Sequence, residues 1–279
     1  MNIISIFQTY IVTPLINVLL LIYHYLVILH VPYPLGFSII CLTIIIRIIL
    51  YPFIAAQLRM SQKMLKIAPH ASRLKEIHKN DAKRLQQETA KLYKEHGVNP
   101  ALGCLPMLIQ LPIIWGLYNM LFNIVSLNPH IAVKKINSVL YSQSLHISGN
   151  WNPQFFGIPL GQTPEHLFAT MGPLILLVPV ITGALQFVQT KMMTPPKNKA
   201  VSTEKKQDDF ASAFQTQSLY IFPIMIGFFS FNFSFGLSLY WNTFTIFGIL
   251  QQYLIKKEDK EKGVVVAPIV SQNNRKRNK

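Results

Sequence analysis

Long apolar runs separated by polar segments dominate the pattern of this 279-residue chain. A run of roughly 18 or more apolar residues is long enough to cross the hydrocarbon core of a bilayer as a helix. Three such runs are clear, and the apolar region 218–253 holds two more helices if the chain reverses near residues 231–234. The pattern predicts an all-α membrane protein with five core transmembrane helices, at residues 36–58, 104–126, 166–190, 217–231 and 232–255.

The polar segment 59–103 has a helical periodicity of its own. Apolar residues recur at helical spacing on both sides of Asn80 and Asp81, which are typical of a turn followed by a helix N-cap. We therefore predict a cytoplasmic helical hairpin here. Residues 127–165 are predicted to form an external loop. Residues 191–216 and 256–279 are polar and aperiodic, and they predict a cytoplasmic linker and a basic cytoplasmic tail.

Lys and Arg residues predict the orientation of the chain. Ten lie between Arg59 and Lys94, five in the linker and eight in the tail, whereas the segment between the second and third core helices has only Lys134 and Lys135. Basic loops stay on the cytoplasmic side of a membrane. Five spans satisfy these counts if the first core helix starts outside, which places the amino terminus outside and the carboxyl terminus in the cytoplasm.

Residues 1–35 are apolar enough to add a sixth span, but Pro32 and Pro34 leave only a very short turn before the next helix. An even number of spans would also break the charge count. We therefore predict an outer interfacial helix, with Tyr10, Tyr23 and Tyr25 at the level of the lipid headgroups.

Composition excludes several classes of protein. Of the residues, 51% are hydrophobic and 13% charged, and the aromatic residues are not interleaved with the basic ones, so direct DNA binding is not expected. The chain has no HExxH, GxSxG or phosphate-loop motif, and Cys41 and Cys104 suggest packing rather than a metal or redox site. We therefore expect no enzyme, cofactor or metal. The amino-terminal sequence, which lacks signal, lipidation and transit features, favours a bacterial plasma membrane.

Arg47 lies inside the first predicted span, where a central arginine costs roughly 2.5 to 3.5 kcal/mol on insertion scales. Thr43 and Tyr51 lie four residues on either side, so the three would form one polar stripe facing a wetted groove. A purely structural arginine would need a buried acid, and no predicted span contains one. Groove partners are expected among the polar residues of the other spans, namely Gln110, Gln186, Gln189, Tyr240 and Trp241.

An uncompensated positive charge in a low-dielectric cavity attracts carboxylates. The short acidic end of a substrate could be drawn part way into the membrane while its apolar helix moves into lipid, where burial drives the process. This interpretation predicts a membrane protein insertase whose partners are nascent membrane proteins and the lipid bilayer. A transporter or channel subunit for anions is an alternative, but it would favour internal repeats and broken helices, which we do not find. A noncatalytic chaperone or assembly factor remains open.

Several segments resemble the bacterial YidC family of membrane protein insertases, which is related to the Oxa-type and Alb-type proteins of organelles. The strongest is KRLQQETAKLYKEHGVNPALGCLPMLIQLPIIWGLY, residues 83–118, and it is supported by IIRIILYPF around Arg47, KMM at 191–193 and IMIGFFSFNFSFGLSLYW at 224–241. From the sequence we expect neither the large periplasmic domain nor the lipoprotein signal of many relatives.

The resemblance implies roles for particular parts of the chain. Arg47 would be the groove arginine, Tyr240 and Trp241 would lie near the groove, residues 59–97 would form a mobile region for substrate capture, and residues 7–29 would form the outer interfacial helix. Family members act alone or beside the Sec translocon, and some hold ribosomes with a basic tail. The candidate ribosome contacts here are Lys256, Lys257, Arg275, Lys276 and Arg277.

Overall fold

The fold is known from a computed structural model, which describes residues 3–99, 105–120, 129–147, 151–193 and 210–261. The helices are α1 (Ile3–Phe7), the π-helical turn η1 (Gln8–Val12), α2 (Thr13–Ile28), α3 (Pro34–Ile49), α4 (Tyr51–Ile77), α5 (Ala82–Glu95), α6 (Leu105–Met120), α7 (Pro129–Asn137), the short turn η4 (Gln143–Leu145), α8 (Pro164–Met171), the short turn η5 (Pro173–Leu176), α9 (Leu177–Met193), α10 (Phe210–Asn232) and α11 (Phe235–Glu261). Two short antiparallel strands, β1 (Gln154–Phe155) and β2 (Ile158–Pro159), complete the described part.

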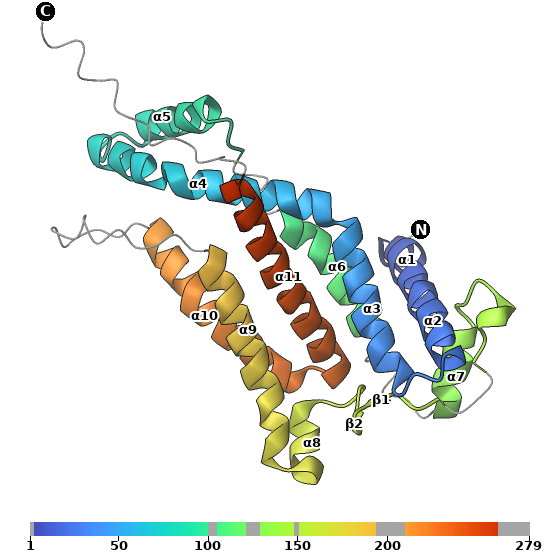
Figure 1. The fold of residues 1–279 in the computed structure, drawn as a ribbon. Coiled ribbons are helices and arrows are strands. Elements are labelled where there is room, and N and C mark those ends of the chain that lie inside the picture. Colours follow the sequence, from blue (N-terminus) through green and yellow to red (C-terminus); the bar gives the residue numbers. More distant parts are fainter. Residues whose placement is uncertain (1–2, 100–104, 121–128, 148–150, 194–209, 262–279) are drawn as a thin grey trace, which may run out of the picture.

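The long helices pack side by side, with α11 between α3 and α9 (Figure 1). The amino end of α11 is fixed by the segment between β2 and α8, because the Phe235 and Gly236 amides donate to the carbonyls of Gln162 and Leu160. The break between α10 and α11 falls within the region where the sequence predicted a reversal. This arrangement brings α11 alongside the helix that carries Arg47.

The predicted first span, residues 36–58, is divided in the structure. Helix α3 ends at Ile49, and α4 continues from Tyr51 at an angle of 65° to it. Pro52 explains the bend, because it has no N–H to donate and its ring clashes with the carbonyl four residues earlier. The predicted boundary at residue 58 therefore lies inside α4. Similarly, a positive φ of 72° at Gly172 divides the predicted span 166–190 into α8 and η5–α9.

Helices α4 and α5 form a helical hairpin. Asp81 is the N-cap of α5, where its Oδ1 accepts a hydrogen bond of 2.9 Å from the Arg84 amide. At the other end, Gly97 adopts a φ of 60°, the left-handed conformation typical after a helix end. The turn and cap are those that the sequence predicted.

Helix α2 lies beside α3 and runs in the opposite direction (Figure 1), and it buries Ile16, Leu19 and Leu20, next to Val12 of η1, in the main apolar core. By length and hydropathy, residues Ser5–Ile28 could cross a membrane. However, Asn17, in the first half of α2, hydrogen-bonds the backbone of Val139 and Tyr141 in the predicted external loop, which favours a position near the outer surface. The outer interfacial placement stays a prediction.

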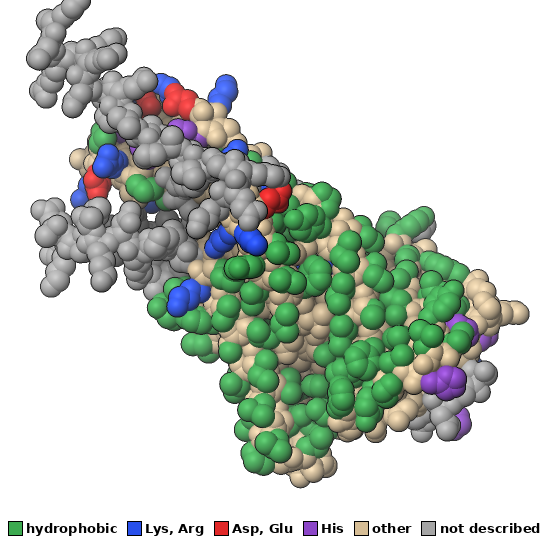
Figure 2. All heavy atoms as spheres, in the orientation of Figure 1, with side chains coloured by type: hydrophobic (Ala, Val, Ile, Leu, Met, Phe, Trp, Pro, Cys, Tyr) green, Lys and Arg blue, Asp and Glu red, His purple; other side chains and the backbone are tan. Residues whose placement is uncertain are grey.

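Hydrophobic side chains cover the flank of the helix bundle, whereas Lys, Arg, Asp and Glu gather at the end that carries α4 and α5 (Figure 2). Many large apolar side chains of the described helices are exposed, among them those of Ile49, Leu174, Val180, Ile224 and Phe228. Such an apolar surface suits lipid rather than water. By length and composition, Ser5–Ile28 and Pro173–Met193 are candidate spans among the described residues, and the bent pair Pro34–Ile49 and Tyr51–Met64 is a third. The protein is an all-α membrane protein.

Candidate functional site

Arg47 lies in the last turn of α3 and is buried, with 4% of its surface exposed. Its Nη2 donates to the backbone carbonyl of Phe244 at 2.6 Å, and its Nη1 donates to Gln251 Oε1 at 3.2 Å. Its Cζ atom lies 3.4 Å from the centroid of the Phe244 ring, which is a cation–π distance. Neutral groups of α11 therefore hold the positive charge.

No carboxylate pairs with Arg47 in the part of the chain that the structure describes. The Nε atom of Arg47 is buried and has no hydrogen-bond partner among the same residues. Burying a charge is costly unless the charge is paired and fully hydrogen-bonded. Arg47 therefore has neither compensation in full among the described residues.

Gly248 leaves the room that this arrangement needs. A Cβ atom at this position would lie 2.7 Å from Arg47 Nη2 and would also collide with Gln189 Nε2 of α9. The ends of the Arg47 and Gln189 side chains thus both lie against the backbone of α11 at Gly248. A side chain at position 248 would require the ends of the Arg47 and Gln189 side chains to move from these positions.

Gln251 makes two hydrogen bonds with Arg47. Besides accepting from the guanidinium, its Nε2 donates to the backbone carbonyl of Arg47 at 3.3 Å. The last four carbonyls of a helix have no donor within it, and Arg47 is one of the last four residues of α3. Through Gln251, α11 therefore contacts both the guanidinium of Arg47 and the backbone just before the bend that follows α3.

A polar strip on α9 continues this site. Trp241 of α11 donates from Nε1 to Gln186 Oε1 at 3.1 Å, and Gln186 Nε2 contacts Gln189 Oε1 at 3.5 Å and Thr190 Oγ1 at 3.4 Å. The predicted partners Gln186, Gln189 and Trp241 thus lie together between α9 and α11. Gln189 brings this strip to Gly248 and hence to Arg47.

The other predicted site residues have different surroundings. Thr43 is buried and donates to the carbonyl of Ile39 in its own helix at 2.6 Å. Tyr51 lies beyond the bend and is exposed, so it does not continue a stripe through Thr43 and Arg47. Tyr240 is buried, and its ring stands 5.9 Å from that of Phe244. Gln110 lies in α6, but its side chain is outside the described residues.

The sequence predicted that Arg47 faces a wetted groove, whereas in the structure α11 covers it. The covering residues, Phe244, Gly248 and Gln251, were not singled out from the sequence. They follow Tyr240 at spacings of four, four and three residues, which places all four on one face of α11. This spacing could have identified the covering residues from the sequence. It was not noticed because, of the three, only Gln251 has a polar side chain.

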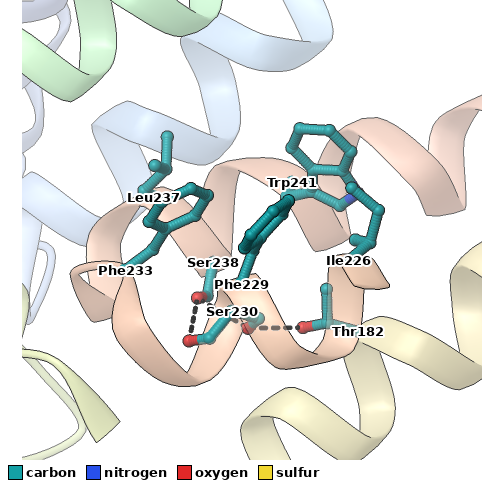
Figure 3. A pocket seen from close by; sticks show the side chains of 8 residues that line it. All are labelled: Thr182, Ile226, Phe229, Ser230, Phe233, Leu237, Ser238 and Trp241. Carbon is teal, nitrogen blue, oxygen red and sulfur yellow. Dashed lines mark hydrogen bonds between the residues drawn. The ribbon is translucent and has the colours of Figure 1, made fainter. Parts of the chain in front are cut away.

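A second polar cluster lies nearer the amino end of α11 (Figure 3). Ser230 of α10 is 3.2 Å from Thr182 Oγ1 of α9 and 2.9 Å from Ser238 Oγ of α11, and the pocket beside these hydroxyls is walled by Phe229, Phe233 and Trp241. Hydroxyl pairs of this kind hold membrane helices together. The cluster therefore positions the three helices that carry the site.

The basic candidates are only partly described. Lys256 Nζ donates to the carbonyl of Met192 at 2.6 Å, near the end of α9, and desolvation there lowers the pKa of Lys256. Lys257 is exposed. Arg275, Lys276 and Arg277 lie outside the described residues. Lys256 therefore links the carboxyl-terminal part of α11 to the end of α9.

The fold and the site define an α-helical membrane protein with a buried arginine that has no carboxylate partner among the described residues. Residues 27–262 match the family described as 60Kd inner membrane protein. The chain belongs to this family, which confirms the resemblance noted from the motifs.

Three relatives illustrate the similarity. The membrane protein insertase MisCA of Bacillus subtilis is 32% identical over 231 residues, which are 81% of this chain and 72% of that protein. The membrane protein insertase YidC of Fusobacterium nucleatum is 31% identical over 80% of this chain and 86% of its own. The inner membrane protein ALBINO3 of Arabidopsis thaliana chloroplasts is 32% identical over 82% of this chain, but the chain spans only 48% of that protein.

Proposed function

We propose that this protein is a membrane protein insertase. It captures hydrophilic ends of nascent membrane proteins in a positively charged groove that opens to the cytosol and to lipid when α11 uncovers Arg47, and it releases their helices into the bilayer. The observation that carries the proposal is the buried guanidinium of Arg47, which has no carboxylate partner among the described residues. The names of the similar insertases support the same function.

The chemistry of capture is electrostatic. A client carboxylate accepts hydrogen bonds from a guanidinium through two oxygens, in shorter and stronger bonds than an amide makes. In a site shielded from water the attraction is larger than at a surface. Arg47 thus holds the acidic end of a client part way into the membrane without any covalent step or nucleotide.

Release is driven by the client itself. Its apolar helix leaves the cytosol along exposed apolar side chains of α9 and α10, such as Val180 and Ile224. Burial of that helix in lipid contributes about 25 cal/mol per Å² of apolar surface. Once the helix spans the bilayer, the carboxylate regains water on the outer side.

The proposed location is a bacterial plasma membrane, with the α4–α5 hairpin and the basic tail in the cytosol and the amino terminus outside. The Sec translocon and the ribosome are proposed partners. The candidate ribosome contacts are Lys256 and Lys257 at the end of α11 and Arg275, Lys276 and Arg277 farther along the tail.

Insertion of a small client with an acidic external tail into liposomes that hold only this purified protein tests the function. Protease protection above that of empty liposomes is the expected result. A charge-assisted hydrogen bond contributes about 1.5–3 kcal/mol, so Arg47→Ala should slow insertion of this client roughly tenfold to a hundredfold. Arg47→Lys should keep part of the activity because the charge remains.

A client with the same helix and a neutral tail is the control, and Arg47→Ala should change its insertion little. Client that stays bound but protease-sensitive with the wild-type protein would instead indicate a chaperone or assembly factor. Equal rates for Arg47→Ala and wild type on the acidic client would contradict capture by charge.

A further inference from the structure

The anion site at Arg47 is occupied by groups of the chain itself. Gln251 and the Phe244 carbonyl take two of its donors, and the Phe244 ring lies over the guanidinium. We propose that Gln251 is an internal competitor, a latch on α11 that a client carboxylate must displace, so that it sets which client tails Arg47 accepts. This inference rests on the proposed function and names the regulation of the same site.

The two bonds to Arg47 differ in length in a way that suits displacement. The bond to the Phe244 carbonyl measures 2.6 Å, whereas the bond to Gln251 Oε1 measures 3.2 Å. Ordinary N–H···O hydrogen bonds measure about 2.7–3.2 Å, so the bond to Gln251 stands at the long end of that range and the bond to the Phe244 carbonyl falls just below its short end. A backbone carbonyl cannot rotate away from its helix, but a side-chain amide can turn about its own bonds. Gln251 is therefore the partner that leaves.

A carboxylate is a stronger hydrogen-bond acceptor for Arg47 than the side-chain amide of Gln251 is. It brings a negative charge and two acceptor oxygens, while the Gln251 amide brings one oxygen and no charge. The buried Nε of Arg47 has no partner among the described residues and is a donor that an entering ligand can use. An acidic tail can thus displace Gln251, whereas a neutral polar tail offers no more than the amide does.

The second bond of Gln251 keeps the latch in place at rest. Its Nε2 donates to the Arg47 carbonyl at 3.3 Å, which directs Oε1 toward the guanidinium. That carbonyl lies just before the bend between α3 and α4. Displacement of the amide therefore loosens α11 from the bend at the same time as it opens the site.

Two substitutions test the latch in opposite directions. Gln251→Leu removes the competitor at similar volume, and Gln251→Glu places a carboxylate permanently beside Arg47. The matched control is Gln252→Leu, because Gln252 is an adjacent buried amide, 3% exposed, for which no bond to Arg47 is found. The readouts are the dissociation constant of a fluorescent client peptide in nanodiscs and its insertion into liposomes, each for an acidic and a neutral tail.

With Gln251→Leu, the acidic peptide should bind roughly threefold to tenfold more tightly, as expected when one competing hydrogen bond is lost. The neutral peptide should bind as before. With Gln251→Glu, the preference for the acidic peptide should disappear. Gln252→Leu should leave both dissociation constants unchanged.

Unchanged or weaker binding of the acidic peptide by Gln251→Leu would overturn the latch. If that variant does not fold, the Gln251→Glu variant decides, and an undiminished preference for the acidic peptide overturns the proposal. The dissociation constants distinguish the Gln251 latch from the proposed insertase function. Tighter binding by Gln251→Leu with no insertion by any variant would support the latch and refute insertion, whereas insertion that depends on Arg47 but not on Gln251 would do the reverse.

Discussion

Gly248 lies directly against the guanidinium of Arg47, so that a Cβ atom at this position of α11 would stand 2.7 Å from Arg47 Nη2. The same atom would collide with Gln189 Nε2, on the opposite side of the site. A single missing side chain thus lets a charged residue of α3 and a polar residue of α9 share one face of α11.

Gly248→Ala should therefore damage the site without altering any of its polar groups. The added methyl group has to displace the ends of both the Arg47 and the Gln189 side chains, and overpacking typically costs about 1–3 kcal/mol. Insertion of an acidic client should fall, and the thermal midpoint in detergent should decrease. The lipid-facing variant Leu250→Ala is the control and should change neither measurement greatly. Wild-type insertion by Gly248→Ala would show that the contact is easily relieved.

The Phe244 ring should contribute to the stability of the closed site. Phe244→Leu keeps the backbone carbonyl that accepts from Arg47 but removes the cation–π contact, which is worth about 0.5–2 kcal/mol. Chemical unfolding in detergent should show a loss of this size. Phe247→Leu is the matched control, since Phe247 is also partly buried in α11 but is not the ring that Arg47 stacks upon. Equal losses in the two variants would attribute the effect to packing alone.

The outer interfacial placement of residues 1–35 predicts where two positions can be labelled. In a cysteine-free background, Ser5→Cys and Leu29→Cys, at the two ends of the helical segment, should both react with an impermeant maleimide added outside intact cells. Ile77→Cys on the α4–α5 hairpin, where the side chain is exposed, is the control and should react only after permeabilisation. Labelling of Leu29→Cys alone from outside would make the segment Ser5–Ile28 a sixth span.

Features set by local sequence were predictable, and those set by contacts between distant helices were not. The apolar runs, the reversal before Ser234 and the Asp81 cap all follow from residues within a few positions of one another. The bend at Leu50 also had a local signal in Pro52, but the uninterrupted apolar run around it suggested one helix. Arg47 was found because a charge in an apolar run stands out. Its partners on α11 were not found, because a carbonyl, a ring and a glycine have no polar pattern.

The close crossing of α9 and α10 supplies a last prediction, on which the geometry of the polar strip depends. A Cβ atom at Gly227 would lie 3.1 Å from the Pro179 carbonyl oxygen and 3.5 Å from the Gly183 Cα. Small residues at such crossings let membrane helices approach closely. Gly227→Leu should force α9 away from α10, lower the thermal midpoint in detergent and reduce insertion of acidic and neutral clients alike. Ile224→Leu, a lipid-exposed change one turn earlier, should be neutral. A selective loss for acidic clients in Gly227→Leu would mean that this crossing acts on Arg47 and not on the helix pair as a whole.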